Sequence, residues 1–212
     1  MKDVYPTGNS VQRALHVLRH AGPRSFVFRL LSECGYRRML LLARSLDAPI
    51  RLPRCPPGVD LAELQAHDFA PYGTLRGPDA AGVFARRCSS GHRCFVARCG
   101  AEVVSACWAA THAARTDYLD CPIVLGPGDV YLYDAFTAAS ARGLALAPLV
   151  CAYQLTVFHD EGCVRAVRAT VPENLPALHA HAKSGFGPIA VMGRVGLGPW
   201  RHHFHRKLGH GA

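Results

Sequence analysis

The sequence lacks a long apolar segment. No window reaches the roughly 18 uninterrupted apolar residues that a membrane span needs, and the nearest, residues 143–158, is interrupted by Pro148 and Gln154. The first six residues also lack the apolar core of a secretory signal peptide. We therefore expect a cytoplasmic protein.

Paired cysteines are also absent. The chain has nine cysteines but no Cys-x-x-Cys pair. The densest group, Cys88, Cys94 and Cys99 with His92 among them, does not have the spacing of a structural zinc site. Buried, reduced thiols are the simpler interpretation. We expect no metal site here.

The net charge is small in the middle of the chain. Half of the 212 residues are apolar and 18% are charged, which is typical of one packed domain. Residues 1–54 carry a net charge of +7, residues 55–193 carry −2 and residues 194–212 carry +4, which together give the formal charge of +9. A nucleic-acid-binding fold usually carries a basic stripe on its own surface. We therefore expect no nucleic-acid partner, and the −2 core argues against a basic adaptor for nucleic acid or membrane.

The basic N-terminal part is predicted to be helical. A stripe of five apolar residues predicts a helix over 10–20. Its basic face suits an anionic membrane or an acidic partner, but the short stripe favours docking on the rest of the protein. A second helix up to Cys34 and a strand over 38–44 follow, so residues 1–52 are interpreted as a basic helix–helix–strand extension. Residues 53–58 are then a Pro-rich linker.

The chain after the linker alternates strands and helices. This order predicts a mixed α/β sheet with at least one right-handed parallel crossover. A basic, His-rich tail over 200–212 is expected to be disordered, although His202, His203 and His205 are residue types that bind transition metals. The expected strands are 59–64, 92–98, 102–110, 130–137, 164–171 and 189–195; the expected helices are 146–159 and 174–183, and 67–87 is helical or irregular.

A turn of small residues connects the strand 130–137 to the helix beginning at Leu146. The N–H groups at such a helix start point at one spot, which suits a pyrophosphate, and small side chains let phosphates approach the main chain. An ordinary strand–turn–helix unit with small residues is the simpler interpretation of these residues alone.

Two motifs together resemble the GCN5-related N-acetyltransferase family over residues 59–199. The run Arg142-Gly143-Leu144-Ala145-Leu146-Ala147 is similar to the family signature Arg/Gln-x-x-Gly-x-Gly/Ala. Asn174, Ala177 and the later Gly185-Phe186 are similar to its second signature, Asn-x-x-Ala…Gly-Phe. The departure is Ala145, where the family usually has glycine. Because the loop would bind through main-chain amides, alanine fits there only if it keeps a negative φ, which we therefore expect.

The resemblance implies an acyl-CoA N-acyltransferase fold, with a mostly antiparallel sheet and a splayed parallel pair formed by strands 130–137 and 164–171. It implies transfer of an acyl group, usually acetyl from acetyl-CoA, to a primary amine by direct attack. The pantetheine arm is then expected on Phe136 and Thr137. The remaining expected cofactor-binding residues are Arg142, Gly143, Leu144, Ala145, Ala147 and Asn174.

Two residues are candidates for proton transfer. The family's proton donor to the thiolate is often a tyrosine seven residues after the asparagine, a position held here by His181. Asp134, an acid in an otherwise apolar strand, is the candidate general base. A solvated helix histidine and a structural hydrogen bond are the competing interpretations, and strand alternation predicts that Tyr133 faces away from Asp134. The alternative function is a catalytically degenerate acyl-CoA-binding module.

Overall fold

The computed structural model describes residues 27–28, 30–32, 34–197 and 200–209. The predicted helix over 10–20 lies outside these residues. Of the second predicted helix, residues 27, 28 and 30–32 are described, and they are helical. None of the described helices combines the length and the apolar character that a bilayer crossing requires.

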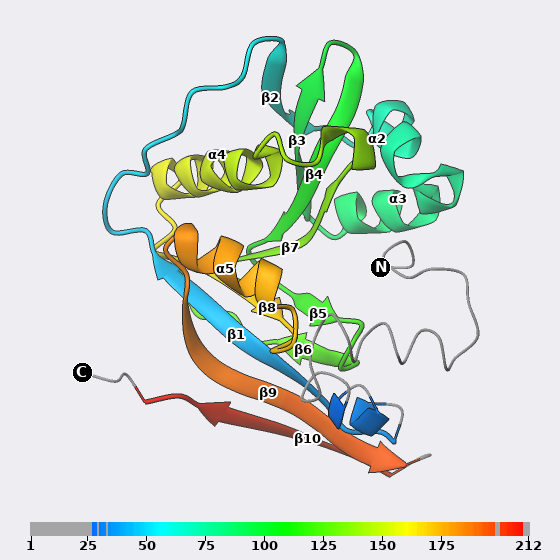
Figure 1. Cartoon of the computed structure of the whole chain (residues 1–212), viewed down its shortest axis with the longest axis vertical. Coiled ribbons are helices and arrows are strands. Elements are labelled where there is room, and N and C mark those ends of the chain that lie inside the picture. The colour runs from blue at the N-terminus through cyan, green and yellow to red at the C-terminus, as the bar shows by residue number, and fades with distance from the viewer. Residues whose placement is uncertain (1–26, 29, 33, 198–199, 210–212) are drawn as a thin grey trace.

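An eight-stranded mixed sheet has the order β10-β9-β1-β8-β7-β4-β3-β2, and β5 and β6 form a separate two-stranded sheet (Figure 1). The strands are β1 (Arg37–Ser45), β2 (Val59–Leu64), β3 (Arg93–Cys99), β4 (Glu102–Ala110), β5 (Ala114–Thr116), β6 (Cys121–Ile123), β7 (Asp129–Thr137), β8 (Arg165–Thr170), β9 (Gly187–Leu197) and β10 (Trp200–Lys207). The helices are α2 (Phe69–Arg76), α3 (Ala81–Ser89), α4 (Leu146–Asp160) and α5 (Leu175–Lys183), with short 3-10 turns η1 (Pro78–Ala80) and η2 (Ala139–Ala141).

The parallel pair β7–β8 divides the sheet. These strands pair only over 129–131 and 165–167, whereas β7 continues to Thr137 and β8 to Thr170. The strands therefore diverge after Tyr131 and Val167, and Figure 1 shows the two halves of the sheet separating at this point. All other pairings in the sheet are antiparallel. The predicted mostly antiparallel sheet with one splayed parallel pair is confirmed.

An ion pair joins β7 to β8 at the closed end of the gap that opens between them. Asp129 is 3% exposed, accepts two hydrogen bonds from the Arg165 guanidinium at 2.8 and 2.6 Å and accepts a third from the N–H of Gly126. Burial alone would raise the pKa of Asp129, but these hydrogen bonds outweigh it and lower that pKa. The first residues of β7 and β8 are thereby held together where the strands are still paired.

The two faces of the sheet are covered by different elements. On one face α4 packs its apolar residues against β3, β4, β7 and β8, and Leu178 of α5 joins the same cluster. On the other face Tyr72 of α2 and Phe84 of α3 pack on β3 and β4, and the β5–β6 sheet packs on β1, β8 and β9. Strand alternation produces this division, because Val130 and Leu132 face α4 and Tyr131 faces the other side.

The predicted division of the chain needs correction at both ends. The strand assigned to a separate 1–52 extension is β1, which pairs with β8 on one side and with β9 on the other. Residues 53–58 therefore connect two strands of one sheet. The sequence pattern showed that a strand was present, but it carries no information about the strand's partners.

The predicted disordered tail is also incorrect over the residues that are described. Trp200–Lys207 form β10, which pairs with β9 along its length. Phe204 stacks on Tyr36 with ring centroids 6.2 Å apart, and Arg201 forms an ion pair with Asp120. These tertiary contacts order a segment whose composition is typical of a flexible terminus.

Candidate active site

The loop between β7 and α4 forms an open pocket at the wide end of the gap. The pocket has a volume of about 320 Å³. Helix α4 begins at Leu146, and among the described residues no side chain caps its first turn. The N–H groups of a first turn have no partner within the helix, so an anion bound here would accept hydrogen bonds from them. The lining residues are Thr137, Ala141, Arg142, Gly143, Ala145, Leu146, Ala147 and Pro148.

Five of the predicted cofactor-binding residues meet at this pocket: Thr137, Arg142, Gly143, Ala145 and Ala147.

Three others do not line it. Leu144 is 56% exposed, and Phe136 lies beneath the guanidinium of Arg76, 4.7 Å from its ring centroid. Asn174 caps α5, since its Oδ1 accepts a hydrogen bond from the N–H of Ala177 at 3.2 Å. The asparagine of the second motif therefore has a local structural role in this chain.

Ala145 adopts a left-handed conformation with φ of +54°. The expectation of a negative φ is wrong, because the chain must reverse at this residue to begin α4. A left-handed alanine places Cβ too close to the following carbonyl oxygen, which costs about 1–2 kcal/mol. The loop therefore holds an alanine in a conformation that glycine adopts without this steric cost.

Replacing Ala145 by glycine is expected to raise the free energy of unfolding by about 1 kcal/mol, since glycine has no Cβ to strain at positive φ. Urea denaturation measures the change. Ala152, in the middle of α4, provides the matched control, where the same substitution should instead cost about 0.5–1 kcal/mol. Equal destabilisation by both substitutions would contradict this account of the loop.

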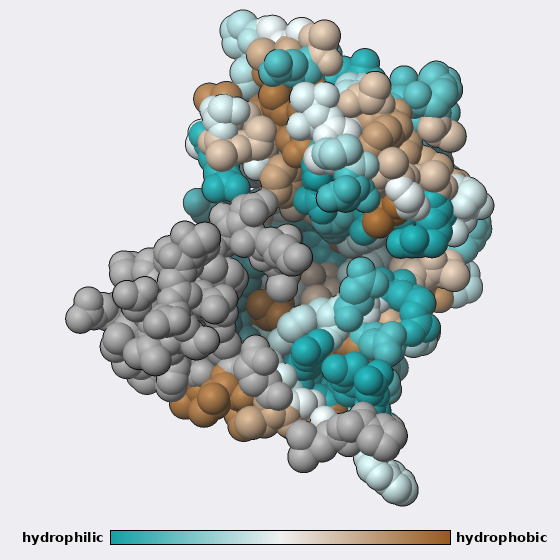
Figure 2. Space-filling model, turned by 90° about the vertical axis from the view of Figure 1, so that its right-hand side faces the viewer, coloured by the Kyte–Doolittle hydropathy of each residue, from teal (hydrophilic) through white to brown (hydrophobic). Residues whose placement is uncertain are grey.

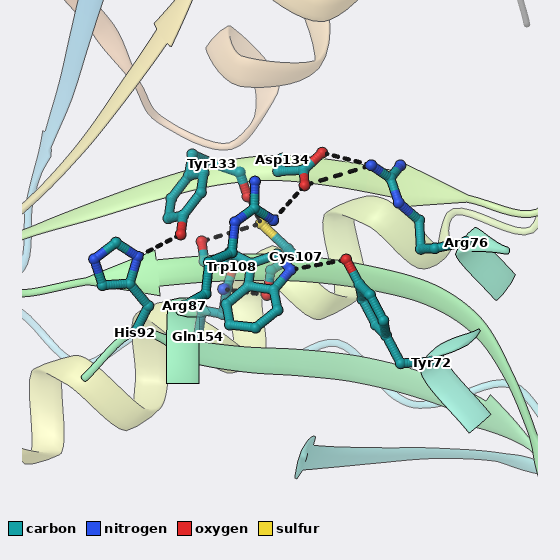
Figure 3. Close-up of polar contacts among 9 residues, drawn as sticks. All are labelled: Tyr72, Arg76, Arg87, His92, Cys107, Trp108, Tyr133, Asp134 and Gln154. Atoms are coloured by element: carbon teal, nitrogen blue, oxygen red, sulfur yellow. Dashed lines mark hydrogen bonds and ion pairs between the residues drawn. The ribbon is translucent and has the colours of Figure 1, made fainter. Parts of the chain in front are cut away.

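A β-bulge in β7 turns the side chain of Asp134 to the same face of the sheet as that of Tyr133. Ala106 pairs with Phe136 and Trp108 with Tyr133, so Cys107 lies opposite both Asp134 and Ala135. Asp134 has φ of +49°, and Figure 3 shows its side chain and that of Tyr133 among residues from α2 and α3. The prediction that Tyr133 faces away from Asp134 is therefore wrong, because a bulge breaks strand alternation.

Two arginines hold the Asp134 carboxylate (Figure 3). Arg76 at the end of α2 contacts it at 3.2 Å and Arg87 in α3 at 2.5 Å. Burial would lower the pKa of Arg87, but the hydrogen bond to Asp134 outweighs it and raises that pKa. The carboxylate oxygens are thus engaged in ion pairs.

A tyrosine–histidine pair lies beside this network. The Tyr133 hydroxyl lies 2.5 Å from Nδ1 of His92, and Nε2 of His92 lies 3.0 Å from the carbonyl oxygen of Ala113. This arrangement assigns the ring proton to Nε2 and makes Nδ1 the acceptor for the hydroxyl. Burial raises the pKa of Tyr133, and burial together with Arg87 lowers the pKa of His92.

His181 lies on α5 and contacts a buried arginine of β8. Its Nδ1 lies 3.1 Å from Nη1 of Arg168, which leaves the ring proton on Nε2. Burial and the charge of Arg168 lower the pKa of His181 to about 4. The imidazole is therefore neutral near pH 7, and the imidazolium that would protonate a thiolate is a minor species.

The sequence-based prediction gave Arg76, Arg87 and Arg168 no role, and it considered His92 only within a cysteine group that lacks zinc-site spacing. Each belongs to an element whose contacts depend on tertiary packing, and an isolated arginine carries no local signal of its partner. Among the described residues, no three His, Cys, Asp or Glu side chains gather closely enough to hold a metal ion.

Comparison with known proteins identifies the fold. No family model matches the chain, and no curated protein matches it in sequence. The solved structures similar to it include a GCN5-related N-acetyltransferase from Sphaerobacter thermophilus (TM-score 0.53, 15% identity, covering 87% of this chain and 57% of that one). A second is a GCN5-related N-acetyltransferase from Kribbella flavida (TM-score 0.52, 19% identity, 87% and 65%).

A third is a GCN5-related glucosamine N-acetyltransferase region of a fungal multi-domain GH3 β-N-acetylglucosaminidase (TM-score 0.57, 13% identity, 87% and 23%). The chain thus spans about 57–65% of the length of the first two structures. At these identities the likeness concerns the fold. The chain has the fold of the GCN5-related N-acetyltransferases.

Proposed function

We propose that the protein is an acyl-CoA-dependent N-acyltransferase that transfers acetyl from acetyl-CoA to a primary amine by direct attack. The observation that carries this proposal is the gap between β7 and β8, with the pocket of loop 142–147 at its wide end. A strand pair that separates exposes main-chain groups for an extended ligand, and a helix start beside it accepts an anion.

In this proposal the pyrophosphate lies against Gly143 and Ala147, and the pantetheine arm extends along the open edge of β7 past Thr137 towards Tyr131. The amine approaches from the side of α2 and α3. Figure 2 shows that the surface on this side is hollowed between the two halves of the molecule. Holding amine and thioester together in this way removes several kcal/mol from the barrier.

We propose that proton transfer uses residues other than Asp134 and His181. Asp134 is engaged by Arg76 and Arg87, so we assign it to positioning the bulge rather than to removing a proton. The Tyr133 hydroxyl is bonded to the neutral His92. We propose that the ammonium proton passes to the Tyr133 oxygen while the hydroxyl proton passes to His92, which returns it to solvent.

A catalytically degenerate acyl-CoA-binding module is the second candidate. It is favoured by the state of the two residues first predicted to transfer protons, because the Asp134 carboxylate is held by two arginines and His181 is neutral. Release of free thiol from acetyl-CoA in the presence of a panel of amines separates the candidates. Binding without release would support the module.

Acetyl-CoA at 100 times its dissociation constant is expected to stabilise the protein by about 2.7 kcal/mol, which raises the melting temperature by about 5–10 °C. Ala147→Glu should abolish this shift, because it places a carboxylate against the pyrophosphate. The variant should fold normally, since an acid is favourable in the first turn of a helix.

Ala147→Gln is the matched control, because it adds the same bulk without the charge and should retain part of the shift. If millimolar acetyl-CoA leaves the melting temperature of the natural protein unchanged, the proposed function is wrong.

A further inference from the structure

Arg168 is a buried cation without an anionic partner. It is 7% exposed, and within the described part of the chain it forms no ion pair with a carboxylate. Its hydrogen-bond contacts are Nδ1 of His181 at 3.1 Å and Sγ of Cys107 at 3.5 Å, and its guanidinium lies over the Phe186 ring, 5.4 Å from the centroid. Its Nε is buried without a hydrogen-bond partner among the described residues. A guanidinium offers five N–H donors, and burial of an unpaired charge is strongly unfavourable.

The guanidinium belongs to the residue at which the gap opens. Val167 is the last residue of β8 that pairs with β7, and Arg168 follows it. A second polar group without a partner lies nearby, because Gln154 of α4 donates its Nε2 hydrogen to the Cys107 carbonyl oxygen while its Oε1 has no partner among the described residues. Buried polar groups that lack partners on the protein require an explanation, and a catalytic role is one of those that occur in folded proteins.

The neighbouring ionisable groups do not supply the missing negative charge. Burial raises the pKa of the Cys107 thiol to about 11, even though Arg168 lowers it in part. Burial also raises the pKa of Tyr131, and His181 is neutral near pH 7. Within the part of the chain that the structure describes, Cys107, Tyr131 and His181 therefore leave the positive charge of Arg168 unbalanced at neutral pH.

We propose that Arg168 stabilises the negative charge that develops on the coenzyme A sulfur as the thioester breaks. This inference rests on the proposed function. The amine nitrogen forms a bond to the carbonyl carbon, the carbon–sulfur bond breaks, its electron pair goes to sulfur, and the ammonium proton leaves to solvent. The pyrophosphate lies at the wide end of the gap, so the sulfur at the far end of the pantetheine arm reaches the narrow end beside Arg168.

This role explains why a neutral histidine occupies the position of the proton donor. His181 accepts a hydrogen bond from the guanidinium and so orients it, and a thiolate beside a fixed cation needs no proton to leave. A charged donor that is already in place in a site without water stabilises such developing charge strongly.

The test measures the pKa of the coenzyme A thiol in its complex with the whole protein. Thiolate absorbance is titrated between pH 5 and 9, with the complex of desulfo-coenzyme A, which lacks the sulfur, as the blank. The ionisable groups that face Arg168 are Cys107, Cys151, Tyr131 and His181, and the blank contains all of them. The bound thiol should titrate at least about one pH unit below free coenzyme A, because an adjacent cation favours the thiolate.

The sign of the pH dependence follows from this shift. A lower pKa in the complex means that binding releases a proton, so affinity for coenzyme A should rise as the pH passes the bound pKa. It should level off above the pKa of the free coenzyme A thiol, at a gain of about ten-fold for each pH unit by which the free and bound pKa values differ. Affinity for desulfo-coenzyme A should not follow this trend.

Two variants separate charge stabilisation from a structural role. Arg168→Met should lose the shift and the pH-dependent gain, keep its affinity for desulfo-coenzyme A, and melt no lower than the natural protein, because an unpaired buried charge has been removed. Arg168→Lys keeps a positive charge and should retain part of the pKa shift of the bound thiol. This variant therefore still tests charge stabilisation if the methionine variant does not fold.

A bound thiol with an unchanged pKa would overturn this inference and leave the proposed function intact. If the thiol pKa is unchanged and succinyl-CoA binds more tightly than acetyl-CoA, the guanidinium serves an acyl carboxylate instead, which also overturns the proposal. Failure of both coenzyme A and desulfo-coenzyme A to bind would overturn the proposed function together with this inference.

Discussion

Replacing Trp108 by alanine is expected to lower the free energy of unfolding by about 3–5 kcal/mol. Trp108 is fully buried on β4, and its ring packs edge-on against Phe84 of α3 and Tyr72 of α2, at centroid distances of 5.4 and 5.9 Å. Its indole N–H also donates to the Tyr72 hydroxyl at 3.0 Å. Alanine would leave both a cavity and an unsatisfied hydroxyl. Urea denaturation at neutral pH measures the loss.

The other tryptophan of the chain provides the matched control. Trp200 is 84% exposed on β10, so its replacement by alanine should change stability by no more than about 0.5 kcal/mol. Trp108→Phe keeps an aromatic ring but loses the hydrogen bond, so its loss of unfolding free energy should lie between those of the two alanine variants. Equal effects of alanine at positions 108 and 200 would contradict the role assigned to this aromatic cluster.

The aromatic cluster also matters for the candidate site. It fixes α2 and α3 on the sheet, and these helices carry Arg76 and Arg87 to Asp134. The sequence predicted only a helical or irregular segment over these helices, because Pro71, Gly73, Gly77 and Pro78 interrupt the periodicity. The partners of Asp134 therefore could not be identified without the fold.

Other parts of the fold could be predicted from the sequence. The apolar helix α4 between two predicted strands predicts a parallel crossover, and β7 and β8 pair in this way. The small residues before Leu146 predicted a phosphate-binding turn, and they line a pocket. These signals are local, since they depend on residues that are adjacent in the chain.

The features that sequence reasoning missed depend on distant contacts or on a single backbone angle. The central position of β1 depends on its pairing with β8 and β9. Asp134 and Ala145 both have positive φ, a conformation that few residues other than glycine adopt. Nothing in an alternating strand pattern indicates that a bulge will turn Asp134 towards α2 and α3.

Replacing Asp134 by alanine is expected to lower the free energy of unfolding by about 2–3 kcal/mol. The loss of the carboxylate leaves the guanidinium groups of Arg76 and Arg87 facing one another, and removal of one partner from a fully buried ion pair costs about 3–5 kcal/mol. The expected value is smaller because the side chains of Asp134, Arg76 and Arg87 are still 25%, 23% and 17% exposed. Urea denaturation measures the change.

Asp134→Gly separates the charge from the backbone strain. Glycine removes the same carboxylate but accepts φ of +49°, so it should be about 1 kcal/mol more stable than the alanine variant. Ala135, the adjacent bulge residue, provides the matched control for Asp134→Gly, since it does not share the positive φ. Ala135→Gly should not raise the free energy of unfolding and should lower it by up to about 1 kcal/mol through backbone entropy.

Asp134→Asn tests the catalytic interpretation of the same residue. If Asp134 positions the bulge and the two arginines, the asparagine variant should lose stability, while turnover with an amine falls less than ten-fold at temperatures where the variant is folded. A general base would behave in the opposite way, because loss of proton abstraction costs about 10²–10⁴-fold in rate and need not alter unfolding. A variant as stable as the natural protein but at least a hundred-fold slower would therefore restore Asp134 as the base and displace the Tyr133–His92 pair from that role.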